Sequence, residues 1–115
     1  MLKLAFVYYP VADLSAALRF YRDELGFEEA WREGEGTAGL VLPGTSARLM
    51  LDVNVDDVEG RPGAVFQVDS VDAFYRTHQG HYAWPQMPVD VPGRRWAIFE
   101  DPTGNLVRLI DESRE

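Results

Sequence analysis

The two histidines, His78 and His81, are the first residues whose spacing could do chemistry. Imidazoles three positions apart on one helix face can both reach a divalent ion, and an unperturbed imidazole titrates near neutral pH. Gly80 stands between them, and a glycine at this point predicts the end of a helix. The two side chains would then lose the helical spacing, so we predict no metal site here.

General acid or base roles are conceivable for Tyr8, Asp52 and Glu100, because a cavity can shift the pKa values of such groups. No nucleophile is paired with a base in a recognisable arrangement. The chain has no cysteine, which excludes disulfides, thiol nucleophiles and thiolate metal sites. We therefore interpret these carboxylates as solvated or ion-paired and predict no catalytic residue.

Aromatic side chains are candidates for ligand binding. Phe6 and Tyr8 alternate with smaller residues and so share one face of a predicted strand. Trp31, Trp84 and Trp96 each fall on a different predicted strand. Such rings can stack on planar ligands or cations for about 0.5–2 kcal/mol each. The alternative is that most of them fill the core, and periodicity does not decide between the two.

The composition predicts one domain, residues 1–115, because a chain of 115 residues with 46% hydrophobic residues can bury a core of its own. The net charge of −8 repels phosphate groups, so we expect no binding to nucleic acid or to an anionic membrane. The N-terminal region shows neither a cleavage pattern nor an apolar segment of spanning length. These features favour a cytoplasmic protein.

The chain repeats itself once. Phe20-Tyr21-Arg22 recurs as Phe74-Tyr75-Arg76, and a glycine, Gly26 or Gly80, follows each copy at the same distance. Upstream, Val11-Ala12-Asp13 is matched by Val68-Asp69-Ser70. The second of these tripeptides lies closer to the Phe-Tyr-Arg that follows it than the first does, which predicts a second helix shorter by about one turn. A period of half the chain predicts two copies of one supersecondary unit.

The first copy, about residues 1–55, reads as β-α-β-β-β. Asp13 can cap its helix and Gly26 can end it. One apolar stripe carries Leu14, Ala17, Leu18, Tyr21 and Leu25. The predicted strands are Leu2–Tyr9, Phe27–Glu33, Thr37–Leu42 and Ala47–Val53.

A charged stretch at about 56–62 is the predicted linker to the second copy, about residues 63–115. Asp69 or Ser70 can cap the second helix, whose predicted buried side carries Val71, Phe74, Tyr75 and His78. The predicted strands are Ala64–Val68, His81–Trp84, Arg95–Glu100 and Leu106–Asp111. Three prolines between Pro85 and Gly93 predict an irregular loop that could act as a lid.

Two motifs carry a family resemblance. Val11-Ala12-Asp13-Leu14 precedes a helix that contains Phe-Tyr-Arg and ends in Leu25-Gly26-Phe27, and Asp101-Pro102-Thr103-Gly104-Asn105 leads into the last strand. In this order they resemble the vicinal oxygen chelate superfamily of glyoxalases, extradiol dioxygenases, and fosfomycin and bleomycin resistance proteins. The resemblance implies an α+β fold in which two tandem βαβββ modules form a pseudo-twofold curved sheet around a cleft.

The same resemblance implies where a metal would be bound. In the family's metal enzymes four strands supply histidine and glutamate ligands, and the matching positions here are Phe6, Leu49 or Met50, Gly63 and Arg108. None of these side chains suits a divalent cation, and a guanidinium is a permanent cation itself. We therefore expect no metal and no other cofactor.

The function that follows from this departure is metal-independent binding of a drug-like or aromatic small molecule, as in bleomycin resistance proteins. The expected ligand-binding residues are Phe6, Tyr8, Trp31, Met50, Trp84, Trp96 and Arg108. The alternatives are a lyase or isomerase that works without the usual metal ligands, and a non-catalytic accessory domain. The resemblance also implies a homodimer.

Arg108 is the most informative single residue. Strand alternation sends Val107 and Leu109 toward the helix and Arg108 toward the concave side. A charge there must be paired or solvated. Its partner could be an inward carboxylate such as Asp52 or Glu100, or its planar donor group could anchor the carboxylate or carbonyl of a ligand.

Overall fold

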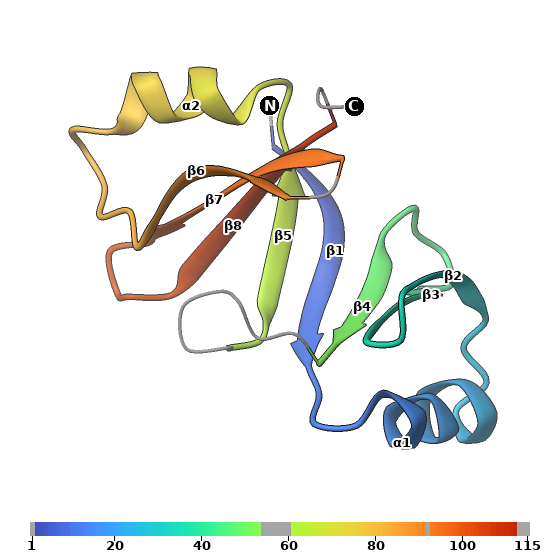
Figure 1. Cartoon of the computed structure of the whole chain (residues 1–115). Coiled ribbons are helices and arrows are strands. Elements are labelled where there is room, and N and C mark those ends of the chain that lie inside the picture. The colour runs from blue at the N-terminus through green and yellow to red at the C-terminus, as the bar shows by residue number, and fades with distance from the viewer. Residues whose placement is uncertain (1, 54–60, 92, 113–115) are drawn as a thin grey trace. The chain divides into compact units, whose positions relative to one another are not determined.

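The structure is a computed structural model that describes residues 2–53, 61–91 and 93–112. The chain divides into two compact units. The first is Ala5–Pro62, and the second is Gly63–Glu115 together with Met1–Leu4. Each unit contains four strands and one helical segment (Figure 1). Most of the predicted linker at 56–62 lies outside the described residues.

The first unit forms a mixed four-stranded sheet. Its elements are β1 (Lys3–Pro10), α1 (Leu14–Leu18), η1 (Arg19–Glu24), β2 (Glu29–Glu33), β3 (Thr37–Val41) and β4 (Arg48–Asp52). The strands lie in the order β2-β3-β4-β1. β1 is parallel to β4, and the other neighbours are antiparallel.

The second unit repeats this topology. Its elements are β5 (Gly63–Gln67), α2 (Val71–His78), β6 (Gln86–Val91), β7 (Arg94–Glu100) and β8 (Leu106–Asp111). The order is β6-β7-β8-β5, with β5 parallel to β8 and the others antiparallel. The two units therefore share one βαβββ arrangement, which confirms the predicted α+β class and the two tandem modules.

The helical segment of the first unit begins as predicted and then widens. Asp13 caps it by accepting a hydrogen bond from the backbone N–H of Ala16 at 3.2 Å. From Arg19 to Glu24 the segment is a π-helix, which carries more residues per turn than an α-helix. Leu25, predicted on the buried stripe, is 53% exposed. That expectation was wrong because the wider turns rotate Leu25 off the core-facing side.

The apolar side of this segment packs on one face of the first sheet. The first core consists of Leu14, Leu18, Ala38, Leu40, Leu49 and Leu51, with Ala17, Tyr21 and Phe27 packed against it. Gly26 follows the segment with φ 87°, a left-handed conformation that glycine adopts without strain. The segment from Leu14 to Glu24 is longer than α2, as the spacing of the repeat predicts.

The second core lies between α2 and one face of the second sheet. It consists of Val68, Val71, Ala97, Phe99 and Leu109, with Phe66, Phe74, Trp84 and Val107 packed against it. Two side chains hold the start of α2. The hydroxyl of Ser70 accepts a hydrogen bond from the N–H of Ala73 at 3.1 Å, and the buried carboxylate of Asp111 accepts one from the N–H of Val71 at 2.6 Å.

Two predictions for the second unit were wrong. Residues 81–84 form a turn instead of a strand, and the predicted lid at 85–93 contains the edge strand β6. Pro88 is tolerated there because the outer edge of an edge strand needs no ladder partner. The sequence pattern did not reveal β6, because this strand contains Pro88 and Asp90, which are residues typical of turns.

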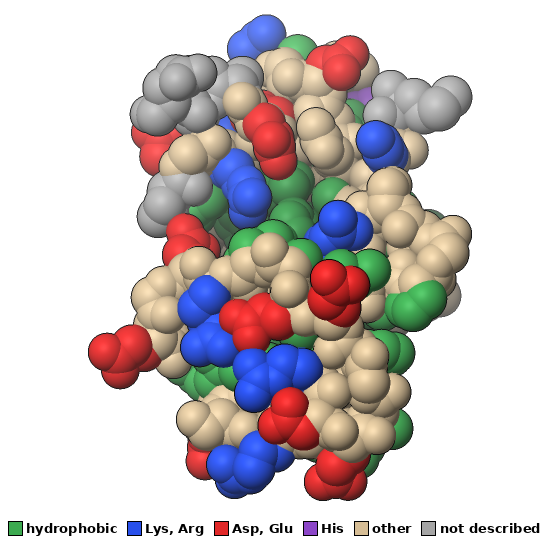
Figure 2. Space-filling view, turned by 90° about the vertical axis from the view of Figure 1, so that its right-hand side faces the viewer, with side chains coloured by type: hydrophobic (Ala, Val, Ile, Leu, Met, Phe, Trp, Pro, Cys, Tyr) green, Lys and Arg blue, Asp and Glu red, His purple; other side chains and the backbone are tan. Residues whose placement is uncertain are grey.

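The remaining strand boundaries agree with the prediction to within two residues, and those of Leu106–Asp111 agree at both ends. No helix among the described residues is long and apolar enough to cross a membrane. On the face drawn in Figure 2, basic and acidic side chains are interspersed, with hydrophobic side chains between them.

Candidate functional site

Each sheet packs on its helical segment through one face, and we call the other face the distal face. The first distal face follows from the register and carries Phe6, Tyr8, Trp31, Thr37, Gly39, Arg48, Met50 and Asp52. The second distal face carries Gly63, Val65, Trp96, Ile98, Glu100 and Arg108. Apart from Trp84 and Leu49, the candidate ligand-binding and metal-ligand positions all lie on one of these two faces.

The structure resolves the register that the sequence left open between Leu49 and Met50. Leu49 packs in the first core. Met50 pairs with Gly39 on one side and with Tyr8 on the other, so its side chain lies on the first distal face. Met50 is therefore the residue at the position that the family resemblance assigns to a ligand.

The aromatic residues of the first distal face meet at Trp31. The rings of Phe6 and Trp31 stand edge to face, with centroids 6.0 Å apart and an interplanar angle of 89°. Phe6 and Tyr8 are only 6% and 3% exposed, whereas Trp31 and Met50 are half-buried. A ligand that reaches this face without displacing β1 would touch Trp31 and Met50 first.

One buried acid lies on the same face. The hydroxyl of Thr37 donates a hydrogen bond to Oδ1 of Asp52 at 2.9 Å, and both side chains are buried. The bond fixes the orientation of a carboxylate in a place of low solvent access, where its charge interacts more strongly than in water. Thr37 was missed by the sequence analysis because β3 is apolar on both faces apart from this residue.

On the second distal face Arg108 lies beside Gly63. Val107 and Leu109 pack with the second core, and Arg108 points the opposite way, as strand alternation predicts. Its side chain is fully buried. Nη1 of the guanidinium is 3.0 Å from the place where a Cβ on residue 63 would sit. The absence of a side chain at Gly63 therefore makes room for the arginine.

Trp96 and Glu100 are on the same face as Arg108, since β7 pairs with β8 without interruption. Trp96 pairs with Val89 on β6 and is half-buried. Glu100 is half-buried as well. The second distal face thus carries one half-buried tryptophan and one buried cation.

Trp84 does not join the other candidates. It precedes β6 and packs on the helix side, in ring contact with Phe74, Tyr75 and Phe99. Its Nε1 donates a hydrogen bond to the carbonyl of His78 at 3.4 Å. The predicted strand position of Trp84 was therefore wrong, and its ring belongs to the second core.

The two histidines stack with neighbouring rings. The imidazole of His78 lies between Phe74 and Tyr82, with centroid separations of 4.4 Å and 5.1 Å. The centroids of His78 and His81 are 6.4 Å apart. Within residues 2–53, 61–91 and 93–112 no three His, Asp or Glu side chains are grouped as a metal site would require.

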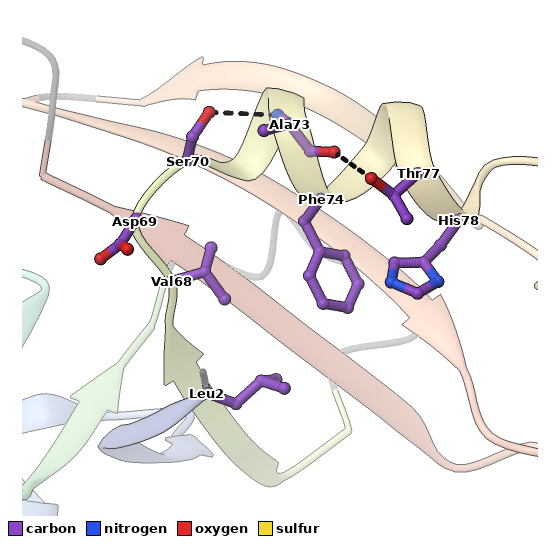
Figure 3. A pocket seen from close by; sticks show the side chains of 8 residues that line it. All are labelled: Leu2, Val68, Asp69, Ser70, Ala73, Phe74, Thr77 and His78. Atoms are coloured by element: carbon purple, nitrogen blue, oxygen red, sulfur yellow. Dashed lines mark hydrogen bonds between the residues drawn. The ribbon is translucent and has the colours of Figure 1, made fainter.

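A shallow pocket of about 340 Å³ lies on the helix side of the second unit, away from its distal face. Figure 3 shows it between α2, the end of β5 and the N-terminal Leu2. The hydroxyls of Ser70 and Thr77 are both engaged in hydrogen bonds with Ala73. The polar groups left to a ligand are the Asp69 carboxylate and the His78 imidazole, at opposite ends of an apolar floor.

The positions that match the family's metal ligands do not fit a metal ion. Phe6 and Met50 offer a hydrocarbon ring and a weakly donating thioether, Gly63 offers no side chain, and Arg108 offers only donors. A buried guanidinium also repels a dication. No step of a reaction can be routed through a metal at these positions.

The comparisons with known proteins agree with this fold. The sequence profile of the Glyoxalase/Bleomycin resistance protein/Dioxygenase superfamily matches residues 3–109. No curated protein sequence matches the chain significantly.

Several solved structures share the architecture. An NAD-dependent benzaldehyde dehydrogenase from Legionella pneumophila is 20% identical over 94% of this chain and 98% of its own, with a TM-score of 0.75. A superfamily member from Vibrio splendidus 12B01 is 20% identical over 97% and 99%, with a TM-score of 0.60. Methylmalonyl-CoA epimerase from Mycobacterium tuberculosis is 25% identical over 96% and 88%, with a TM-score of 0.64. With the profile match over nearly the whole chain, these findings show that the protein belongs to the Glyoxalase/Bleomycin resistance protein/Dioxygenase superfamily.

Proposed function

We propose that this protein binds a small aromatic molecule without the help of a metal ion and releases it unchanged. The observation that carries the proposal is the set of residues at the four family ligand positions, Phe6, Met50, Gly63 and Arg108. None of them offers the imidazole or carboxylate donor that such a metal site uses. Phe6, Met50 and Arg108 offer an aromatic ring, a thioether and a cation instead, and such groups bind organic ligands.

The distal faces support the proposal by what they expose. Trp31 and Met50 on the first face and Trp96 on the second are half-buried, so each is anchored in the sheet and still offers apolar surface. Aromatic rings and thioethers are adaptable contacts for planar ligands. Arg108 is fully buried, so it contributes positive charge to the second face and no exposed surface.

Metal independence is tested on the purified protein. We expect elemental analysis to find no stoichiometric metal, and Zn²⁺, Ni²⁺, Mn²⁺ and Fe²⁺ to leave the melting temperature unchanged. A ligand at 100 times its Kd adds about 2.7 kcal/mol to the free energy of unfolding, which such a scan would detect. Near-stoichiometric metal whose binding is lost on changing distal-face residues would contradict the proposal.

Ligand binding is tested with a library of drug-sized aromatic compounds. We expect a hit to quench tryptophan fluorescence and to be recovered chemically intact after prolonged incubation. Chemical conversion of the hit would identify an enzyme. The absence of any hit, with distal faces filled by their own side chains in a crystal structure, would favour a non-catalytic accessory domain.

A second candidate, an isomerase that moves a proton, is favoured by one observation. The Thr37–Asp52 pair places an oriented, buried carboxylate on the first distal face, and the epimerase from Mycobacterium tuberculosis shares the fold at 25% identity. Asp52 would remove the proton from the carbon next to a carbonyl, and the resulting enolate would take a proton from solvent on its opposite face, which inverts that carbon. Incubation with methylmalonyl-CoA in D₂O tests this: deuterium uptake that disappears in Asp52→Asn would support it, and no uptake would exclude this substrate.

We also propose that the protein forms a homodimer, as the family resemblance implies. Light scattering after size-exclusion chromatography should give twice the mass of the 13.0 kDa chain. A monomeric mass across the accessible concentration range would contradict this proposal and leave the ligand-binding proposal intact.

A further inference from the structure

We infer that Trp31 is the platform on which a planar aromatic ligand stacks, and that Gly39 together with a β-bulge at Ala30 positions it. The inference rests on the proposed small-molecule binding and names the residue that provides it. It also assigns a role to Gly39, which is a glycine in the interior of a strand, where glycine weakens the sheet unless another group approaches closely.

The first observation is the bulge. Glu29 pairs with Leu40, which packs in the first core, whereas Trp31 pairs with Gly39 on the first distal face. In a regular strand, residues two positions apart share a face. The register shift between Glu29 and Trp31 inserts Ala30 as an extra residue and turns Trp31 to the other side. Without the bulge the indole would face the helical segment.

The ion pairs around the bulge keep Glu29 on the helix side. Glu29 accepts hydrogen bonds from Arg22 at 2.7 Å and from Arg32 at 2.8 Å. Arg22 belongs to η1, so this contact ties the bulged strand to the helical segment. The carboxylate and the indole are thereby held on opposite faces of β2, although only one residue separates them in sequence.

The second observation is the seat of the indole. A Cβ built on Gly39 would overlap the ring of Trp31, 2.5 Å from Cζ2 and 2.6 Å from Nε1. Real Cβ atoms do not approach other atoms so closely, so only glycine at position 39 leaves space for the indole where it lies. Phe6 then contacts the ring edge to face and holds it from the side.

The third observation is what the seat leaves exposed. Trp31 and Met50 are both half-buried, and Gly39 on β3 pairs with Trp31 on β2 and with Met50 on β4. The two apolar side chains therefore stand on one level of the first distal face, with only a glycine between them in the sheet. Trp84 does not lie on a distal face, because it packs among other rings on the second core. A flat aromatic molecule laid against Trp31 would gain stacking without moving the backbone.

The position of Trp31 is tested first, by NMR on the ¹⁵N-labelled protein. The indole N–H of Trp31 is assigned as the signal lost in Trp31→Phe. We expect Gly39→Ala to shift this signal and to lower the melting temperature, whereas Gly80→Ala, at an exposed glycine with open space around it, should do neither. In the Trp31→Ala background, Gly39→Ala should no longer lower the melting temperature. An unchanged Trp31 signal in Gly39→Ala would overturn the inference.

Binding is tested with two planar probes, 1-naphthol and N-methylquinolinium, and with the saturated decahydro-1-naphthol as a non-planar control. We expect the planar probes to shift the signals of Trp31 and of the Met50 methyl group. Trp31→Ala and Gly39→Ala should each weaken this binding at least tenfold, and Gly80→Ala should leave it unchanged. If Gly39→Ala does not fold, Trp31→Ala carries the same comparison.

The outcomes separate this inference from the proposed function. Binding that shifts Met50 but keeps its affinity in Trp31→Ala would overturn the platform and leave small-molecule binding standing. Equal binding of the saturated control would show that stacking is not the contact, which also overturns it. If neither planar probe nor any library compound binds the wild-type protein, the proposed function and the platform fail together, even where the Gly39 variants confirm the seat.

Discussion

Arg108 and Gly63 form a steric pair: the Nη1 atom of the buried guanidinium occupies the space beside the missing side chain, 3.0 Å from a Cβ that residue 63 does not have. The family resemblance matches both positions to metal ligands of the family's metal enzymes. Here they lie on the neighbouring strands β5 and β8, and the missing side chain of Gly63 leaves space for the guanidinium of Arg108.

Gly63→Ala should therefore lower the free energy of unfolding by about 1–2 kcal/mol, because the new Cβ crowds a buried group. Most of this loss should disappear in the Arg108→Met background, where a flexible thioether can give way. Chemical denaturation of the four variants measures the coupling. Equal effects of Gly63→Ala in both backgrounds would show that Arg108 does not fill this space.

Thr37→Val should destabilise the protein by about 1–3 kcal/mol, since the buried Asp52 carboxylate loses its donor at 2.9 Å. Thr77→Val is a matched control because the Thr77 hydroxyl is exposed and bonds only to the carbonyl of Ala73. Thermal denaturation near neutral pH distinguishes the two. If the two substitutions have the same small effect, the Thr37–Asp52 bond does not contribute measurably to stability.

The start of α2 offers a comparison of two caps. Asp111→Asn should cost about 1–3 kcal/mol, because a buried carboxylate accepts the 2.6 Å hydrogen bond from the N–H of Val71. Ser70→Ala should cost about 1 kcal/mol, the usual value for an N-cap. Urea denaturation ranks them, and hydrogen exchange at Val71 and Ala73 shows which N–H loses protection. A larger effect of Ser70→Ala would reverse the ranking proposed here.

Asp101 should make stability depend on acid pH. Its carboxylate accepts hydrogen bonds from the side chain and backbone of Asn105 and from Thr103, which lower its pKa from 3.8 to about 2. A carboxylate whose pKa is lowered by folding stabilises the protein at pH values above its unfolded pKa. This stabilisation is lost as the pH falls from about 4 to about 2.

Asp101→Asn should thus lower the melting temperature at pH 7, and the difference from wild type should shrink between pH 4 and pH 2. Asp90→Asn is a comparison at a more exposed carboxylate, whose ion pair with Arg95 has the geometry of a surface contact. A pH-independent difference for Asp101→Asn would mean that the turn depends on the shape of residue 101 and not on its charge.

The sequence repeat shows how much of the structure can be predicted from the sequence. The order β-α-β-β-β, the Asp13 cap and the shorter second helix are local properties of composition and spacing, and the structure has all of them. Of the two predicted cap candidates for the second helix, Asp69 and Ser70, the structure uses Ser70. The orientation of Arg108 also followed from the sequence alone, because β8 is a regular strand flanked by two core residues.

The repeated Phe-Tyr-Arg shows a feature of the structure that the sequence does not predict. Phe74 packs on the second core, whereas Phe20 is 47% exposed and its neighbour Tyr21 packs on the first core instead. Identical residues thus face different ways, because Phe20 is six residues after the start of α1 and Phe74 is only three residues after the start of α2. The change of turn type in η1 adds a further rotation that an α-helical period cannot anticipate.

The sequence by itself determined the family and the two modules, because these depend on residue identity and order. Only the tertiary structure decided which aromatic residues face the distal sides. Trp84 turned into the second core because residues 81–84 form a turn, and Trp31 turned to the first distal face because of one bulge and one glycine. The bulge is a single-residue irregularity, and in a strand of period two a shift of one residue reverses the face of every side chain after it.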